Sequence, residues 1–227
     1  MQKAKRAPGK RIKILIVDDH PLVRQGIENF INQHKDLLTC GQAEDEEEAL
    51  RLVDQKTPDV VVVDLSLKNS SGYSLIKKLA EIYPSLPILV LSMHEESLHA
   101  ERSLKLGARG YVMKTDNPAR LIEGLRCVSR GKIYLSDEIN EQLLLKAVDG
   151  KSASTSIADV LTARELEVFE LVGRGKKSHD IAAHLGISRK TVDVHRQNIK
   201  TKLKLRNSAE LIKKAVEYAG LAQWPGS

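Results

Sequence analysis

Five side chains that together could perform phosphoryl chemistry are spread over the first half of the sequence: Asp18, Asp19, Asp64, Ser92 and Lys114. Three carboxylates held close together repel one another and raise one another's pKa values unless a cation neutralises them. Oxygen ligands of this kind suit Mg²⁺, which keeps several waters and is usually completed by a phosphate. The hydroxyl of Ser92 and the mobile ammonium group of Lys114 suit a phosphoryl group bound beside the metal. The set predicts a site for Mg²⁺ and phosphate, provided that the fold brings its members together.

The elements that must position these residues are short apolar runs, which alternate with helical patterns near 21–34, 45–55, 72–83, 95–106 and 118–130. The runs are ILIVDD (14–19), LLTCGQAE (37–44), VVVVDL (60–65), PILVLS (87–92) and GYVMK (110–114). Runs that are apolar on both faces suit the buried strands of a parallel sheet. Five such units predict a doubly wound, flavodoxin-like α/β domain with a five-stranded parallel sheet.

Each of the five side chains has an ordinary structural interpretation when it is taken singly. An Asp that follows a strand is more often a turn residue or a helix N-cap than a ligand. All five, however, fall at the predicted ends of the first, third, fourth and fifth strands, and ligands of open α/β sheets bind outside those ends. The constellation, rather than any one member, favours a functional site.

Positions 12–130 resemble the receiver domain of two-component response regulators in the acid pair, the strand that ends in Asp64, the strand that ends in Ser92, and the lysine of GYVMK. The resemblance implies that Asp64 accepts a phosphoryl group from the phosphohistidine of a sensor histidine kinase. It also implies that Asp19, Asp64 and the backbone carbonyl of Ser66 hold Mg²⁺, with Asp18 acting through water. Ser92 and Tyr111 match the switch positions that reorient on phosphorylation.

The loop DLSLKNSSG (64–72) departs from the receiver pattern at three positions. Leu67 and Lys68 stand where the family commonly has Met-Pro, and Ser71 stands where Asp or Asn is frequent. These departures put the conformation of the loop and the phosphorylation rates in doubt, but not the nucleophile.

The last third of the chain differs in charge and in pattern. The net charge is +6 over residues 1–13, −6 over 14–150 and +6 over 151–227. A helix is predicted at 137–148, and the small polar residues of VDGKSASTSIAD (148–159) predict a linker. The expected division is a basic disordered tail (1–11), the receiver domain (12–133), a helix and linker (134–159) and a second domain (160–222). A basic domain points to nucleic acid.

Helix punctuation after residue 160 predicts four helices, which form a small all-α domain. Thr162 with Glu165 makes a capping box, and further helices are expected to start at Ser178, Ser188 and Ser208 and to stop at Gly186 and Gly220, with Gly175 ending the first. The second and third are joined by a short turn, which is the pattern of a helix-turn-helix.

The third helix opens SRKTVDVHRQNIKTKLKLR (188–206), in which Asp193 is the one acid. At 100° per residue, Val192, Ile199 and Leu203 share a face that must be buried. The opposite face and its flank fit a recognition helix in the major groove, where the flank would contact phosphates and the stripe would read bases. The predicted contacts are Arg189, Lys190, Thr191, Asp193, Val194, Arg196, Gln197 and Lys200, and Thr201 lies on the same exposed face.

Two residues of this helix have competing interpretations. Asp193 either accepts from a cytosine amino group, excludes wrong sites, or simply faces solvent. His195 lies at the edge of the buried face and is interpreted as a hydrogen-bonded packing residue. In the fourth helix, Leu211, Ala215 and Tyr218 either pack on the core of the domain or contact a partner subunit, and a shared role is slightly favoured.

The stretch LTARELEVFELVGRGKKSHDIAAHLGISRKTVDVHRQNIKTKL (161–203) resembles the LuxR/NarL/FixJ-type DNA-binding domain nearly end to end. With the receiver, it implies a cytoplasmic response regulator that binds double-stranded DNA, pairs as a homodimer on activation, and controls transcription, with RNA polymerase as a further candidate partner and no membrane. It would be no enzyme beyond its own phosphoryl transfer and autodephosphorylation.

Two alternatives remain open. An aspartyl-nucleophile phosphotransferase or phosphatase is weakened because Asp64 is followed by Leu-Ser rather than by a second Asp two residues on. An atypical receiver, regulated by a protein partner without phosphate, is opposed by the intact acidic set.

Overall fold

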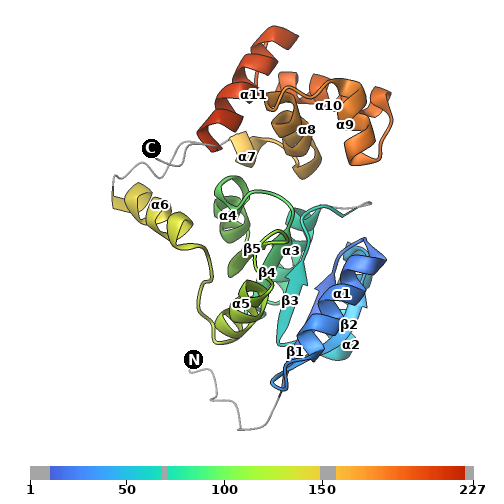
Figure 1. The fold of residues 1–227 in the computed structure, drawn as a ribbon, viewed down its shortest axis with the longest axis vertical. Coiled ribbons are helices and arrows are strands. Elements are labelled where there is room, and N and C mark those ends of the chain that lie inside the picture. The colour runs from blue at the N-terminus through green and yellow to red at the C-terminus, as the bar shows by residue number, and fades with distance from the viewer. Residues whose placement is uncertain (1–10, 68–70, 149–156, 223–227) are drawn as a thin grey trace. The chain divides into compact units, whose positions relative to one another are not determined.

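The computed structural model describes residues 11–67, 71–148 and 157–222 (Figure 1). The chain divides into two compact units, Met1–Leu145 and Lys146–Ser227. Most of the expected basic tail and much of the expected linker, residues 149–156, lie outside the described residues. No helix among the described residues is long and apolar enough to cross a membrane.

The N-terminal unit contains a parallel sheet in the order β2-β1-β3-β4-β5. Its strands are β1 (Ile12–Val17), β2 (Leu37–Ala43), β3 (Val60–Val63), β4 (Ile88–Ser92) and β5 (Gly110–Met113). This order reverses direction at β1, so the carboxyl ends of β1 and β3 lie side by side at the topological switch point. The predicted five-stranded, doubly wound α/β fold is confirmed.

Helices connect successive strands and cover the sheet (Figure 1). They are α1 (Pro21–Asn32), α2 (Glu46–Lys56), α3 (Gly72–Ile82), α4 (Glu96–Lys105) and α5 (Ala119–Ser129), and α6 (Asp137–Val148) follows. Residues alternate along each strand between the two faces. Ile14, Val62 and Leu89 pack with Ile31 of α1 and Leu125 of α5 in one core. Because these residues are fully buried, the strand ends that carry the polar residues are held rigidly.

The C-terminal unit is helical and has a core of its own. Its elements are α7 (Ile157–Val160), α8 (Ala163–Gly173), α9 (Ser178–Leu185), α10 (Arg189–Lys202) and α11 (Ser208–Ala222). Phe169, Ile181, Val192 and Leu211, one from each of the four longer helices, are all fully buried in this core. The predicted helix-turn-helix is formed by α9 and α10.

The helix boundaries in this unit follow the predicted signals closely. Thr162 and Glu165 form the expected capping box, Ser188 caps α10 by accepting from the backbone N–H of Thr191, and Gly186 ends α9 with a φ of 64°. The expected stop at Gly220 is wrong, because α11 continues to Ala222. A glycine costs only about 1 kcal/mol inside a helix, so it does not have to end one.

The expected linker is also shorter than its composition suggested. Residues 157–160 form the helix α7, and Ile157 and Val160 pack on the core of the C-terminal unit. Two apolar side chains on one helical turn are enough to dock this segment, although its neighbours in the chain are small and polar. Cys40 and Cys127 are free thiols, and both are half-buried.

Candidate functional site

The acidic site lies where β1, β3 and β5 end. Asp18 and Asp19 follow β1, Asp64 follows β3, and all three are buried, with exposed fractions of 1, 8 and 4%. Lys114 follows β5, and its Nζ lies 2.6 Å from Oδ2 of Asp18 and 2.6 Å from Oδ2 of Asp64. The parallel sheet therefore brings together residues that are far apart in the sequence, as their positions at strand ends predicted.

The charges of this cluster are coupled. Burial raises the pKa of Asp64 above its ordinary value of 3.8, Lys114 acts in the opposite direction, and Asp18 adds to the rise. Burial alone would lower the pKa of Lys114, but Asp64 and Asp18 outweigh it and raise that pKa. Lys114 alone cannot neutralise the charge of three carboxylates, so the site favours the binding of a further cation.

Asp19 shows where that charge fits. Its Oδ1 atom is buried and makes no hydrogen bond among the described residues, although Nδ1 of His20 lies 2.6 Å away. Asp18, Asp19, His20 and Asp64 each offer a ligand atom, and these atoms lie within 4.8 Å of one another. Hard oxygen donors with an unsatisfied buried carboxylate fit a divalent cation such as Mg²⁺. His20 was not among the predicted site residues, although it is adjacent to the acid pair in the sequence.

The loop after β3 holds Asp64 in place. The backbone N–H of Ser66 points to Oδ1 of Asp64 at an N···O distance of 3.4 Å. At Gly72, a Cβ atom would lie 2.2 Å from the backbone oxygen of Asp64, so the loop can close only over a glycine. Ser71 caps α3 by accepting from the N–H of Tyr73, which gives the departure at this position a structural role. Lys68 lies outside the described residues, and the backbone carbonyl of Ser66 stays a predicted ligand.

The two predicted switch residues lie beside this site. Ser92 is fully buried at the end of β4, and its hydroxyl accepts from the backbone N–H of His94 at 3.3 Å. The hydroxyl of Tyr111, on β5, donates to the backbone carbonyl of His94 at 3.0 Å. Both residues therefore bond to one peptide segment in the loop between β4 and α4.

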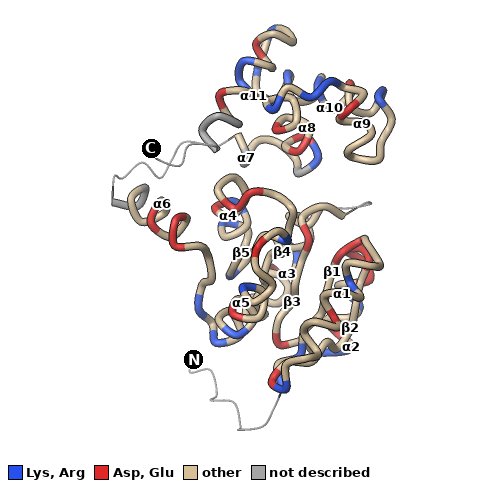
Figure 2. The backbone as a smooth tube through the Cα atoms, viewed as in Figure 1, with Lys and Arg blue, Asp and Glu red and all other residues tan. Residues whose placement is uncertain are grey.

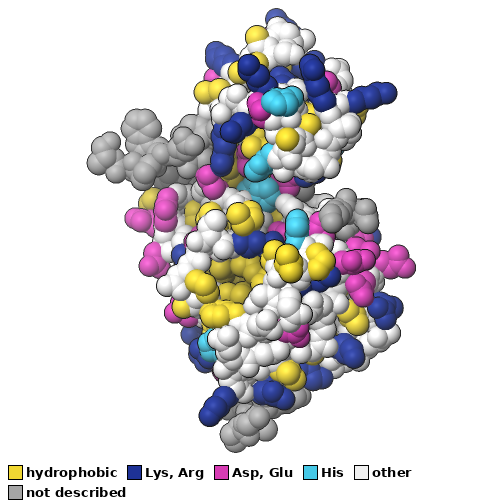
Figure 3. Space-filling model, turned by 45° about the vertical axis from the view of Figure 1, so that its right-hand side comes forward, with side chains coloured by type: hydrophobic (Ala, Val, Ile, Leu, Met, Phe, Trp, Pro, Cys, Tyr) yellow, Lys and Arg dark blue, Asp and Glu magenta, His cyan; other side chains and the backbone are white. Residues whose placement is uncertain are grey.

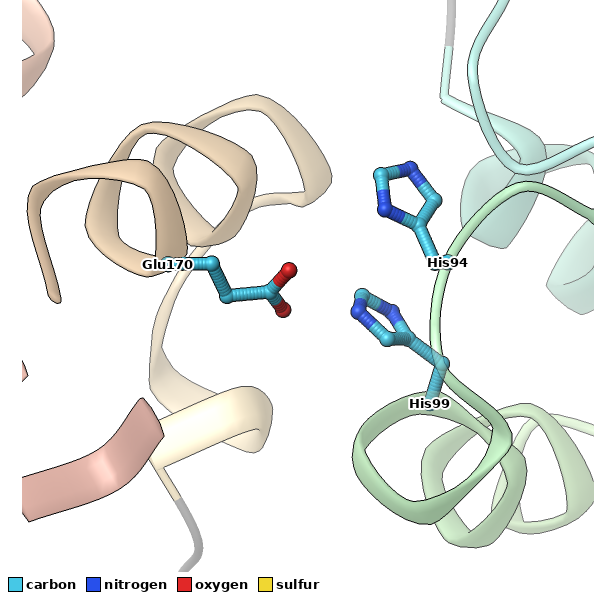
Figure 4. Close-up of side chains that lie close together, drawn as sticks. All are labelled: His94, His99 and Glu170. Atoms are coloured by element: carbon cyan, nitrogen blue, oxygen red, sulfur yellow. The ribbon is translucent and has the colours of Figure 1, made fainter. Parts of the chain in front are cut away.

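A polar chain that the sequence did not predict extends from this loop. His94 Nε2 lies 2.9 Å from the hydroxyl of Ser66, and the ring of His94 stacks on that of His99 at 4.7 Å (Figure 4). His99 Nδ1 in turn lies 2.6 Å from the hydroxyl of Tyr73 on α3. The chain joins the loop after Asp64 to α4. Nothing in the sequence marks these contacts, because the residues share no spacing or motif. Glu170, also drawn in Figure 4, belongs to α8 of the C-terminal unit.

The candidate nucleic-acid interface is the helix-turn-helix of the C-terminal unit. Lys and Arg recur along α10 (Figure 2) and stand out over the surface of this unit (Figure 3). Val192 and Ile199 are fully buried and Leu203 is half-buried, as predicted. The opposite face is exposed, as expected for a surface that can enter a groove: Arg189, Lys190, Asp193, Val194, Gln197 and Thr201 are exposed, whereas Thr191, Arg196 and Lys200 are half-buried.

Two charged residues of α10 have contacts inside the unit. The hydroxyl of Ser178, at the start of α9, donates to Oδ1 of Asp193 at 3.1 Å and accepts from Arg196 at 3.2 Å. The solvent-facing interpretation of Asp193 is therefore incomplete, because this carboxylate is tied to the helix before it. The same bridge fixes the guanidinium group of Arg196 on the flank of α10.

Lys202, a basic residue at the end of α10, forms an ion pair in the structure. Its Nζ lies 2.6 Å from Oε2 of Glu165, the capping-box residue of α8. Burial alone would raise the pKa of Glu165, but hydrogen bonds from Lys202 and Thr162 outweigh it and lower that pKa below 4.5. Lys202 thus joins α10 to α8, and the carboxylate of Glu165 neutralises its charge.

His195 and one face of α11 lie inside the C-terminal unit. His195 is half-buried, but its Nδ1 has no hydrogen-bond partner among the described residues. Burial and the nearby Arg164 lower its pKa below 6.5. Leu211 and Ala215 are fully buried in the core of the unit, and Tyr218 packs on Phe169 at 5.6 Å between ring centroids. The predicted core role of this face of α11 is therefore confirmed, and its contact with a partner subunit stays a prediction.

Comparisons with known proteins agree with both halves of this geometry. Residues 14–126 match the response regulator receiver domain, and residues 159–215 match the luxR family of bacterial regulatory proteins. Oxygen regulatory protein NreC of Staphylococcus epidermidis is 36% identical over 214 residues, which cover 92% of this chain and 96% of that protein. Transcriptional activator protein ExaE of Pseudomonas putida is 35% identical and covers 92% of this chain and 97% of its own length.

Solved structures give the same result. RcsB from Salmonella enterica serovar Typhimurium, bound to a promoter in the presence of the phosphomimetic BeF3−, is 27% identical, with a TM-score of 0.57 over 91% of this chain and 98% of that one. A two-component response regulator of the LuxR family from Aurantimonas sp. SI85-9A1 is 32% identical, with a TM-score of 0.57 over 61% of this chain and 99% of its own. The chain therefore belongs to the NarL/FixJ family of two-component response regulators, in which a receiver domain is joined to a LuxR-type helix-turn-helix, and it is a DNA-binding transcriptional regulator.

Proposed function

We propose that this regulator is controlled by phosphorylation: Asp64 accepts a phosphoryl group from a sensor histidine kinase, and the phosphorylated receiver controls how α10 binds double-stranded DNA. The observation that carries the proposal is the convergence of Lys114 with two carboxylates from different strands, at 2.6 Å from each. Three buried acids around one lysine are more than a structural ion pair needs. They fit a site that binds a cation together with an anionic group.

The chemistry asks Asp64 to act as a nucleophile. One of its carboxylate oxygens forms the new O–P bond while the N–P bond of the phosphohistidine breaks. The leaving imidazole nitrogen keeps the electron pair of that bond and takes a proton from solvent. Lys114, which is already bonded to Oδ2 of Asp64, is placed to neutralise charge on the transferring oxygens.

The proposed Mg²⁺ ligands are Asp19, Asp64 and the backbone carbonyl of Ser66, with Asp18 acting through water. When bound, the ion supplies further neutralisation of the phosphoryl oxygens. The Oδ1 atom of Asp19 fits this role, because a buried carboxylate oxygen that makes no hydrogen bond is costly unless a cation approaches it.

The signal would leave the site through the loop between β4 and α4. Ser92 would turn its hydroxyl towards the phosphoryl group and give up its bond to the N–H of His94. Tyr111 holds the carbonyl of the same residue, so the loop and the switch tyrosine would move together. Such a shift biases a two-state equilibrium at the face of α4, β5 and α5. The expected outcome is homodimer formation on two DNA half-sites, with RNA polymerase as a further partner.

The two alternatives are less well supported. A receiver that is not phosphorylated would not explain why three acids are buried together. A dedicated phosphatase or phosphotransferase would not explain the DNA-binding unit, so we propose that the chain catalyses only its own phosphoryl transfer and hydrolysis. Because a bacterial regulator meets its DNA in the cytoplasm, the proposal places the protein there.

The test is intact-mass analysis after incubation with a small phosphodonor such as acetyl phosphate, with Mg²⁺ or with EDTA. The wild-type protein should gain the mass of one phosphoryl group with Mg²⁺ and far less with EDTA. Asp54→Asn, an exposed acid on α2, serves as the matched control and should behave as wild type. An Asp64→Asn protein that gains one labile phosphoryl group at the wild-type yield would overturn the assignment.

A further inference from the structure

His20 lies at the rim of the acidic site with its ring directed at two carboxylates. Its Nδ1 atom is 2.6 Å from Oδ1 of Asp19 and 3.4 Å from Oδ1 of Asp18. The oxygens that it approaches are not the ones that Lys114 binds, because Lys114 contacts Oδ2 of Asp18 and Oδ2 of Asp64. The lysine and the histidine therefore approach the acidic cluster through different oxygen atoms.

Capping of α1 does not account for the orientation of the His20 ring. It is the N-cap residue of α1, where a polar side chain commonly accepts a hydrogen bond from the first turn. His20 makes no such bond, and Pro21 follows it at the start of the helix. Its side chain is 60% exposed, so packing does not force the ring against the acids. The backbone N–H of His20 also donates to Oδ1 of Asp18 at 2.8 Å, which anchors the residue beside the site.

The distances are those of neighbouring ligands around one metal ion. Divalent ions of this size bind oxygen and imidazole nitrogen at about 2.0–2.1 Å, so adjacent ligand atoms in an octahedron lie about 2.9 Å apart. The 2.6 and 3.4 Å separations from Nδ1 of His20 lie on either side of that value. The Oδ1 atom of Asp19 that Nδ1 of His20 approaches makes no hydrogen bond among the described residues, although its side chain is 93% buried, so a cation bound by both atoms would satisfy it.

We propose that His20 is an additional ligand of the cation in the acidic site, and that its nitrogen gives the site a preference for a transition ion such as Mn²⁺ over Mg²⁺. The proposal rests on the cation site of the proposed function and adds a ligand to it. Mg²⁺ prefers oxygen, whereas imidazole suits the first-row transition ions and gains affinity along their series. A nitrogen ligand at this rim changes which ion the site holds without altering the three carboxylates.

The experiment uses the full chain, Mn²⁺ as the probe, and pulsed electron paramagnetic resonance to detect nitrogen bound to the ion. Unlabelled wild-type protein should show a ¹⁴N coupling, and wild-type protein labelled with ¹⁵N-histidine should show a ¹⁵N coupling in its place. This comparison identifies a histidine ligand without any amino-acid substitution. His20→Asn should remove the coupling and weaken Mn²⁺ binding by about tenfold, while Mg²⁺ binding, followed by competition, changes little. His179→Asn is the matched control, because His179 is an exposed histidine 3.1 Å from a single carboxylate, Asp180.

The outcomes separate this inference from the proposed function. One outcome refutes only the new ligand: the wild type binds Mn²⁺ without a histidine coupling, His20→Asn binds Mn²⁺ as the wild type does, and Asp19→Asn loses Mn²⁺ binding. In that case His20 is not a ligand and the oxygen site stands. If Mn²⁺ binding in the wild type is also unchanged by Asp19→Asn, the acidic site holds no cation and both proposals fail. A histidine coupling that survives His20→Asn but disappears in His179→Asn would likewise overturn the assignment of His20.

Discussion

Lys114 and Asp64 are 50 residues apart in the chain, yet Nζ of one lies 2.6 Å from Oδ2 of the other. The contact exists because β3 and β5 run parallel in one sheet and end at the same edge. Asp18 shares the same lysine from the end of β1. The ammonium group of Lys114 therefore pairs with two carboxylates, and the carboxylate of Asp19 repels both of them. Such an arrangement favours the binding of a cation at the expense of the stability of the fold.

The first prediction concerns the loss of stability that comes from burying these carboxylates together. The pKa of folded Asp64 is raised above 3.8, so the folded state binds its proton more tightly than the unfolded state does. Stability is therefore greatest below pH 3.8 as far as this group is concerned, and is lost as the pH rises through the folded pKa. At pH 7 without metal, Asp64→Asn should therefore unfold at a higher temperature than the wild type does.

Calorimetry of the metal-free protein with and without Mg²⁺ provides the measurement. Mg²⁺ should stabilise the wild type and narrow its difference from Asp64→Asn, since the ion relieves the same repulsion. Asp137→Asn, an exposed acid in the first turn of α6, should bring no gain. A metal-free Asp64→Asn protein that is less stable than the wild type would show that the lysine pairs outweigh the repulsion.

A second prediction separates two lysines of α10. Lys202→Met leaves the buried carboxylate of Glu165 without its cation, so it should destabilise α8 and α10 by about 2 kcal/mol, seen as lower amide-exchange protection. It should leave the salt dependence of DNA binding nearly unchanged. Lys200→Met should leave amide-exchange protection nearly unchanged and should flatten the salt dependence of DNA binding by roughly one unit of slope. Equal effects of both variants on the salt slope would refute the assignment of Lys202 to the fold.

The third prediction is a pH dependence in the C-terminal unit. The pKa of His195 is lowered from 6.5, mainly by burial and then by Arg164, so the unfolded state binds the proton more readily. The stabilising effect of neutral His195 is complete above pH 6.5 and is lost as the pH falls from 6.5 through the folded pKa. Titration of the ring by NMR should give a pKa below 6.5, and thermal melts should lose this slope in His195→Asn. A ring that titrates at or above 6.5 would contradict the account.

A fourth prediction distinguishes phosphate contacts from base contacts on α10. Gln197 is exposed on the face away from the core, so Gln197→Ala should relax preference at one base pair, at a cost of ~1–3 kcal/mol if the contact is bidentate. Arg196, held on the flank by Ser178, should affect all sequences about equally when it is changed to alanine. Binding-site selection with each variant measures both. A Gln197→Ala protein that selects the wild-type motif, with Arg196→Ala altering one base, would reverse these roles.

The fold and the acidic site could be predicted because both follow from simple periodicity. Short apolar runs of β-branched residues such as VVVV favour buried strands, and parallel strands bring their terminal residues, here Asp18 and Asp64, to one edge. The buried face of α10 follows from the helical repeat in the same way, which is why Val192 and Ile199 were placed correctly.

Contacts that depend on side-chain direction could not be predicted. The ion pair of Lys202 with Glu165 and the bridge from Ser178 to Asp193 depend on how helices pack, which a charge count does not contain. The chain from Ser66 through His94 to His99 has no sequence signal at all. The docking of α7 was missed for a further reason: two apolar residues within a polar segment resemble a linker more than a helix.

The central claim is that phosphate on Asp64 controls DNA binding, and selection from genomic DNA tests it most directly. Sheared fragments are bound by wild-type or Asp64→Ala protein, with and without phosphodonor and Mg²⁺, and the recovered DNA is sequenced. We predict a defined set of fragments whose enrichment by the wild type rises severalfold with the donor, while Asp64→Ala recovers them weakly under both conditions. If wild-type and Asp64→Ala proteins recover the same fragments equally well, whether or not donor is present, DNA binding does not depend on phosphate and the account is contradicted.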